Sequence, residues 1–188
     1  MRLSMMNRED PFQESQLLRQ AKAGDRQAMG VLIRQHQGAI WAVCRRMFAG
    51  QPEDAADVAQ DAVVKLIKQL PRFDPDGSAR LETWIVTVTT RVCLDALRRR
   101  KIRQVSPLSM RTETQGEPES RAFARQVEDY VARLPAEQRA VLVLRSYHDL
   151  ELEEIAEALG VPKGTIKSRL SRARSALRDL METTGSAS

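Results

Sequence analysis

The sequence predicts an all-α protein made of two small helical domains joined by a flexible linker, with a helix-turn-helix in the second domain. Only 4% of its 188 residues are aromatic, and straight side chains that lose little rotamer freedom in a helix abound. Apolar residues recur at helical spacing in both halves. A segment rich in Pro, Gly, Ser, Thr and Glu, residues 105–119, lies between them. We therefore divide the chain into a first domain (1–104), a linker (105–125) and a second domain (126–188).

The first two predicted helices cover residues 11–23 and 25–49. Each follows a start signal, Asp10-Pro11 in one case and Gly24-Asp25 in the other. An Asp side chain caps free main-chain amides, and Pro fits the first turn of a helix. We therefore expect two helices at the start of the chain.

Two more apolar stripes predict the third and fourth helices. The third stripe begins at Ala55 and stops at Pro71, which cannot continue a helix. The fourth follows the turn signal Asp74-Pro75-Asp76-Gly77 and runs from Leu81 to Ala96. Together the four helices form a compact first domain.

The polar face of the third helix is acidic. Asp54, Asp57 and Asp61 share this face, with Gln60 beside them. Like charges so close repel one another, so the face is either solvated, a metal site or a dock for a basic protein surface. The metal site is the weakest interpretation, because no further ligand completes a coordination shell. Docking is the better functional interpretation, and we expect no metal or other cofactor.

Five of the six residues 98–103, at the end of the fourth helix, are basic. Cations stabilise a helix C-terminus through the macrodipole, and they also neutralise phosphates. We favour phosphate contact. Nearby, Phe73 and Trp84 have two interpretations, stacking on an exposed base or burial in the core, and core burial is favoured for Trp84 because it fits the apolar stripe.

The second domain contains a helix pair joined by Leu159-Gly160-Val161-Pro162. Gly160 can take the positive φ that ends a helix, and Pro162 prevents the helix from resuming. The second helix of the pair, residues 163–180, turns an apolar face inward at i, i+4, i+7 and i+11, formed by Ile166, Leu170, Ala173 and Leu177. This is the pattern of a helix-turn-helix.

Charge is concentrated on the outer face of that second helix. Residues 163–178 contain six Lys or Arg and no acid, whereas residues 149–157 contain five acids and no base. A solvated charged face is the alternative, but small and basic residues on one side of a helix suit a major groove. The sequence therefore predicts a module that binds double-stranded DNA.

Other function classes are poorly supported. No apolar run has the roughly 18 residues of a membrane span, and the polar N-terminus is not a signal peptide, so we expect a cytoplasmic protein. Cys44 and Cys93 lie within apolar patterns, which favours core packing over metal or redox roles. No nucleophile pairs with a base, and a nuclease built on the acidic face is a remote alternative. We expect no enzyme.

Both halves resemble a bacterial sigma factor of the extracytoplasmic-function (ECF) group, the short members of the sigma-70 family with only conserved regions 2 and 4. The residues EDAADVAQDAVVKLIKQLPRFDP resemble the polymerase-binding helix and the loop after it. ETWIVTVTTRVCLDALRRRK resembles the minus-ten helix. The residues LPAEQRAVLVLRSYHDLELEEIAEALGVPKGTIKSRLSRARSAL resemble the reader of the minus-thirty-five element.

The resemblance implies a role for each group of residues. The acidic face, which consists of Asp54, Asp57, Gln60 and Asp61, would contact the β′ clamp helices of RNA polymerase. The fourth helix would face the minus-ten element through Thr87, Thr90, Arg91, Asp95, Arg98 and Arg99, and the loop from Phe73 to Thr83 would receive a flipped base. The last helix would read the minus-thirty-five element through Lys163, Thr165, Lys167, Ser168, Arg169, Ser171 and Arg172.

The implied function is transcription initiation without covalent chemistry. The chain would bind core polymerase through the clamp helices and the β flap, and would direct it to promoter DNA. An anti-sigma protein is an expected regulator. The alternative is a two-domain helix-turn-helix regulator that binds duplex DNA without polymerase, which a gel-shift comparison separates from a sigma factor.

Overall fold

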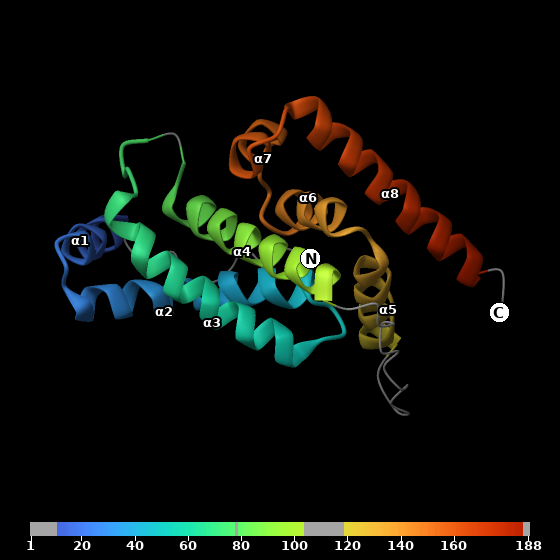
Figure 1. Ribbon diagram of the computed structural model, residues 1–188, viewed down its shortest axis with the longest axis horizontal. Coiled ribbons are helices and arrows are strands. Elements are labelled where there is room, and N and C mark those ends of the chain that lie inside the picture. The colour runs from blue at the N-terminus through green and yellow to red at the C-terminus, as the bar shows by residue number, and fades with distance from the viewer. Residues whose placement is uncertain (1–10, 78, 104–118, 186–188) are drawn as a thin grey trace.

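The structure is a computed structural model that describes residues 11–77, 79–103 and 119–185. All regular elements in these ranges are helices, which confirms the predicted all-α class. The first cluster contains α1 (Pro11–Lys22), α2 (Arg26–Met47), α3 (Pro52–Gln69), the short 3-10 helix η1 (Leu70–Arg72) and α4 (Leu81–Arg103). The second contains α5 (Glu119–Arg133), α6 (Ala136–Tyr147), α7 (Leu152–Leu159) and α8 (Lys163–Gly185). Figure 1 shows the two clusters side by side.

The N-terminal helices begin and end close to their predicted positions. Asp25 caps α2, since its side chain accepts hydrogen bonds from the main-chain amides of Gln27 at 2.8 Å and Ala28 at 3.1 Å. Before it, Gly24 has a φ of +96°, which glycine adopts without strain. The predicted start signal at Asp10 lies outside the described residues. The turn before α4 is held by Asp74, whose carboxylate accepts from the amide of Asp76 at 3.1 Å.

The core of the first cluster lies between α2, α3 and α4, with α1 packed across α2. Leu32, Met47, Leu66 and Ile85 are among its fully buried side chains. Burying a side chain of this size stabilises the fold by about 1.5–3 kcal/mol relative to leaving it exposed. The stripe of small apolar residues on α3 is buried, for example at Ala55. The polar face of α3 therefore points toward solvent.

The second cluster packs α6, α7 and α8 together, with α5 beside α8. Leu144, Ile155 and Ile166 lie fully buried at its centre. Helix α5 begins at Glu119, so residues 119–125, which were predicted to belong to the linker, are helical. The rest of the predicted linker up to residue 118 lies outside the described residues.

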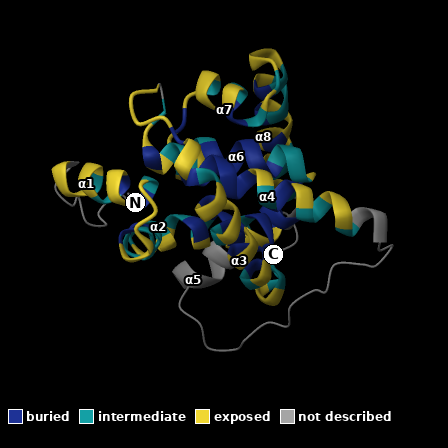
Figure 2. Ribbon diagram, turned by 60° about the vertical axis from the view of Figure 1, so that its left-hand side comes forward, coloured by how far each residue is buried: buried dark blue, intermediate teal, exposed yellow. Residues whose placement is uncertain are grey.

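The two clusters are in contact. Helices α6 and α7 pack against α4, and α5 and α6 also reach α2. The buried apolar residues form a continuous core from Leu18 to Ala173. In Figure 2 the buried residues gather where α4 and α6 lie, whereas exposed residues are prominent on α1. This packing places the C-terminal helices directly over one face of α4.

Candidate nucleic-acid interface

Helix α8 has the two faces that its sequence predicts. Ile166, Leu170 and Ala173 are buried against α6 and α7. Lys167 and Arg172 are exposed on the opposite side. The remaining residues expected to read DNA are placed as follows: Ser171 and Lys163 are exposed, and Thr165, Ser168 and Arg169 are half-buried. The exposed basic face therefore has the form that a major groove accommodates.

The turn between α7 and α8 fixes the direction of this helix. Gly160 ends α7 in the left-handed conformation with a φ of +65°, as predicted. Its amide donates to the carbonyl of Glu157 at 3.2 Å, and the amide of Val161 donates to Ala156 at 3.1 Å. Pro162 then starts α8 by accepting from the amide of Thr165 at 2.8 Å. These bonds satisfy two of the free carbonyls at the end of α7 and give one amide near the start of α8 a partner.

One end of the basic face is neutralised within the protein. Lys163 donates to the carboxylate of Glu153, and this bond lowers the pKa of Glu153. Both side chains are exposed, so the pair is a weak one in solution. Ser168 donates to the carbonyl of Thr165 at 2.9 Å. Lys167 and Arg172 are therefore the stronger candidates for contact with DNA.

The acidic face of α3 is largely exposed, but one of its members is paired. Asp57, Gln60 and Asp61 are exposed to solvent. Asp54 is half-buried and lies 2.6 Å from the guanidinium of Arg100 on α4. The structure thus separates Asp54 from the other three, which remain available to a partner.

Two apolar residues extend this exposed face and were not singled out from the sequence. Val64 and Ile67 are 49% and 42% exposed. They follow Gln60 by four and seven residues, which places them on the same side of α3. The signal that could have revealed them is their position outside the buried Ala/Leu stripe. An exposed apolar pair beside acidic residues indicates a protein-binding surface.

On α4, two of the residues expected to face the minus-ten element are buried. Thr87 and Thr90 were expected to face DNA, but they are only 7% and 0% exposed. The hydroxyl of Thr90 donates to the carbonyl of Val86 at 2.7 Å, one turn earlier. A threonine hydroxyl in a helix often makes this bond when it is buried. In this arrangement neither side chain is presented to solvent.

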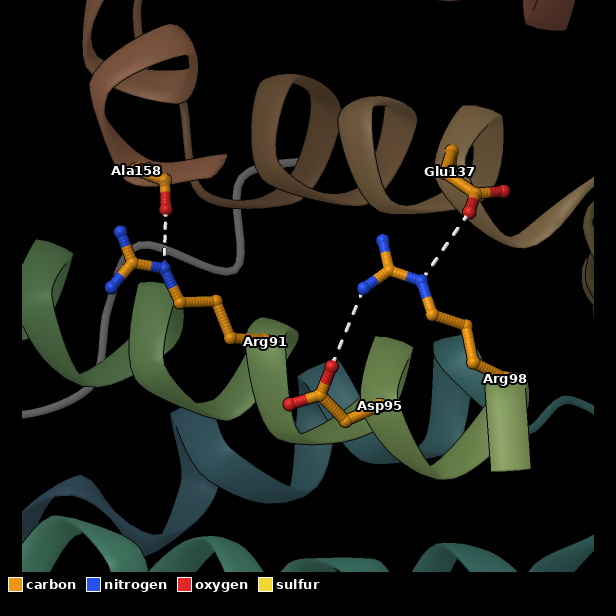
Figure 3. A network of polar contacts seen from close by, with 5 residues as sticks. All are labelled: Arg91, Asp95, Arg98, Glu137 and Ala158. Carbon is orange, nitrogen blue, oxygen red and sulfur yellow. Dashed lines mark hydrogen bonds and ion pairs between the residues drawn. The ribbon is translucent and has the colours of Figure 1, made fainter. Parts of the chain in front are cut away.

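The other expected minus-ten residues lie on the exposed edge of α4. Arg91 donates from Nε to the carbonyl oxygen of Ala158 in α7 at 2.6 Å. Arg98 pairs with Asp95 at 3.4 Å and with Glu137 of α6 at 3.7 Å. Figure 3 shows Arg91 and Arg98 pointing from α4 toward the C-terminal helices. Arg99 is exposed.

The two aromatic residues near the start of α4 contact each other. The rings of Phe73 and Trp84 have centroids 5.2 Å apart and are tilted by 49°. Phe73 is buried and Trp84 is half-buried against the core. Lys22 of α1 donates to the carbonyl of Phe73 at 2.6 Å. Of the two interpretations, core packing is the one that this geometry supports.

Cys44 and Cys93 lie fully buried in the first core, where the two sulfur atoms are 3.8 Å apart. The hydrogen bond to Cys44, with burial, raises the pKa of the Cys93 thiol far above its usual value. Core packing is thus the role that the structure supports. Within the described ranges, no three His, Cys, Asp or Glu side chains are grouped to hold a metal ion. No described helix is long and apolar enough to cross a membrane.

The glycine turn and the exposed basic face of α8 are typical of a helix-turn-helix protein that binds DNA. The other cluster adds an exposed acidic and apolar face, as expected of a transcription factor that also binds a protein. Comparisons with known proteins give its family. Residues 32–102 match the model of Sigma-70 region 2, and residues 124–177 match that of Sigma-70, region 4.

Similar proteins span nearly the whole chain. The ECF RNA polymerase sigma factor SigM of Mycobacterium tuberculosis is 33% identical over 168 residues, covering 89% of this chain and 84% of SigM. SigW of Bacillus subtilis, also an ECF sigma factor, is 28% identical over 176 residues, covering 86% and 92%. The structure of CnrH in complex with the cytosolic domain of CnrY is similar with a TM-score of 0.64 and 25% identity, covering 91% of this chain and 98% of CnrH.

The chain belongs to the ECF group of sigma-70 family RNA polymerase sigma factors, with regions 2 and 4. It is therefore a transcription initiation factor, not an enzyme, and it directs RNA polymerase to promoters. RNA polymerase and promoter DNA are its partners as a member of this family.

Proposed function

We propose that the outer face of α3 docks on the β′ clamp helices of core polymerase. The observation that supports this is the continuous exposed face formed by Asp57, Gln60, Asp61, Val64 and Ile67. Its acids provide complementarity to a basic surface, and its apolar pair provides buried area on binding. Asp54 contributes less directly, because it is already paired with Arg100.

We further infer a bipartite reading of the promoter. The exposed residues Lys167, Ser171 and Arg172 of α8 contact the minus-thirty-five element, supported by Lys163, Thr165, Ser168 and Arg169. The second cluster as a whole, residues 126–188, engages the β flap. The first domain, residues 1–104, reads the minus-ten element with α4, where Arg91, Arg98 and Arg99 supply the positive charge and Asp95 lies beside them.

We also propose control by an anti-sigma protein and action in the cytoplasm, where bacterial polymerase works. CnrH, whose fold is similar, was solved with the cytosolic domain of CnrY bound. The RpoE structure from Bartonella quintana, similar in fold with a TM-score of 0.63, contains the anti-sigma factor NepR. Because the two clusters are in contact, one regulator can reach surfaces on both of them.

The docking surface is tested by measuring the affinity of the labelled protein for core polymerase. Asp61→Lys reverses a charge in the centre of the surface, and Val64→Asp removes apolar area. Each is expected to weaken binding by about tenfold or more, equivalent to about 1.4 kcal/mol. The control is Gln20→Lys, which also introduces a lysine at an exposed site, on α1. Equal affinity in all three variants contradicts the proposed surface.

A further inference from the structure

The loop that joins η1 to α4 is held at its first residue by the end of α1. This recognition loop consists of residues 73–80, of which the structure describes 73–77, 79 and 80. The ammonium group of Lys22, the last residue of α1, donates to the carbonyl oxygen of Phe73 at 2.6 Å. Helix η1 packs against α1, and Figure 1 shows α1 beside the end of α3, where the loop begins.

The bond from Lys22 adds to two other contacts that fix Phe73. The amide of Phe73 donates to the carbonyl of Leu70 at 3.0 Å, and its ring lies 5.2 Å from that of Trp84, centroid to centroid. These two contacts hold the amide and the side chain. The Lys22 bond holds the remaining group, the carbonyl, from which the rest of the loop continues.

The conformation of Phe73 sets the direction of the loop. With a φ of −64° and a ψ of 129°, Phe73 leaves the helical region in which η1 lies. The helical and extended wells are both open at this φ and differ in ψ. Rotation about ψ turns the carbonyl and swings residues 74–77, which are exposed. A cation fixed on that carbonyl by a charge-assisted bond therefore keeps the loop in one of the two wells.

The end of α1 is itself well fixed, which makes Lys22 a firm anchor. Leu18 and Ala21 are buried in the core of the first cluster. The amides of Ala23 and Gly24 donate to carbonyls of α1 at 3.0 and 3.1 Å, which closes its last turn. A lysine at this end of a helix is also favoured by the macrodipole.

The anchor comes from a part of the chain that the family model does not include. The model of Sigma-70 region 2 matches residues 32–102, which contain η1, the recognition loop and α4. Helix α1 precedes this range. The contact between Lys22 and Phe73 is therefore not implied by membership of the family.

We propose that Lys22 is a positioning residue for the minus-ten element, because it holds the recognition loop in the conformation that accepts an unstacked base. The inference rests on the proposed function, in which the first domain reads that element. Without the bond the loop divides its time between two conformations, and only one of them binds the base. If that conformation is populated one-tenth of the time, a tenfold contribution from the base falls to about twofold.

The test measures the affinity of the holoenzyme for fork-junction DNA whose single-stranded end carries the minus-ten element of a promoter found by transcript-start sequencing. Each base of that end is removed in turn to leave an abasic site. In the parent protein we expect one abasic position to weaken binding by about tenfold or more, as for loss of a stacked base. With Lys22→Met, which keeps the stem and removes the ammonium group, this penalty should fall to about twofold.

Three further variants separate positioning from charge and from folding. Lys22→Arg restores a charged donor and should keep most of the penalty. Arg19→Met, at an exposed site one turn earlier on α1, removes a positive charge without touching the loop and should keep all of it. Lys22→Ala, which suits a helix, should repeat the loss seen with Lys22→Met. Thermal unfolding and affinity for core polymerase should match those of the parent in each variant.

The outcomes distinguish this inference from the proposed function. An unchanged penalty in both Lys22→Met and Lys22→Ala overturns the positioning role. Weaker binding by the same factor at every position also overturns it, because uniform loss is the mark of a phosphate contact. If no abasic position weakens binding of the parent protein, the assignment of the minus-ten element to the first domain fails instead.

Discussion

The guanidinium of Arg139 in α6 hydrogen-bonds the main-chain carbonyl oxygen of Met47 at the end of α2. These residues belong to different helical clusters and are 92 positions apart. Burial lowers the pKa of Arg139 to about 10, so the group stays charged at neutral pH. Its two terminal nitrogens donate to the carbonyls of Met47, Ala132 and Leu134, whereas Nε is buried without a hydrogen-bond partner. Main-chain carbonyls at helix ends therefore hold most of this buried charge.

Replacing this arginine is expected to destabilise the fold. Arg139→Met keeps much of the apolar stem but leaves buried carbonyls without a donor, which costs about 1–3 kcal/mol for each buried group left unpaired. We expect a loss of at least about 2 kcal/mol in the free energy of unfolding, measured by urea denaturation. Arg34→Met, at an exposed site on α2, is the control and should change stability by less than about 0.5 kcal/mol. Similar stabilities for the two variants contradict the anchoring role.

The stability of the protein should fall in mild acid because of His148. Burial, together with the nearby charge of Arg46, lowers the pKa of His148 from 6.5 to about 4. Between these values the unfolded chain binds a proton that the folded chain excludes, so stability is lost as the pH decreases from 6.5 toward 4. The loss from this group amounts to about 3 kcal/mol at most.

The variant His148→Asn tests this dependence. Its unfolding free energy should change less between pH 7 and about pH 4.5 than that of the parent protein, as measured by urea denaturation. His36→Asn, which keeps His148, should retain the parent behaviour. If the parent and His148→Asn lose stability equally, His148 is not the group responsible.

The sequence predicts the local features of this protein well. The capped start of α2 at Asp25, the left-handed Gly160 and the two faces of α8 all follow from residue types within one or two turns. The contact between clusters does not follow from such patterns, because Arg91 and Ala158 are 67 residues apart. Arginines are normally exposed, so no local pattern predicted the burial of Arg139. The burial of Thr87 had no local signal either. The acidic face was predicted, but its apolar extension at Val64 and Ile67 was not.

The two cysteines should be unreactive in the folded protein. Both thiols are fully buried, and the raised pKa of Cys93 disfavours the thiolate, which is the reactive form. We expect no reaction with a disulfide reagent such as Ellman's reagent under native conditions, and reaction of two thiols after denaturation. Rapid loss of free thiols from the native protein contradicts the buried packing of Cys44 and Cys93.

The exposed basic face of α8 should control affinity for promoter duplexes. Lys167→Ala and Arg172→Ala are each expected to weaken binding of the holoenzyme by about tenfold if the side chain contacts a base edge. If the side chain contacts a phosphate, the slope of log K against log salt concentration should become shallower by about one unit. Arg34→Ala is the control for loss of one positive charge. Unchanged affinity and salt dependence in both α8 variants contradict the assignment of this face.

We propose that this one chain couples polymerase docking on α3 to promoter reading on α8 and α4. Run-off transcription with core polymerase on a promoter library, followed by sequencing of the transcript starts, tests it most directly. We expect starts that share an upstream and a downstream element, lost with Asp61→Lys and retained with the control Gln20→Lys. No transcript above that of core polymerase alone, on any promoter of the library, would contradict it.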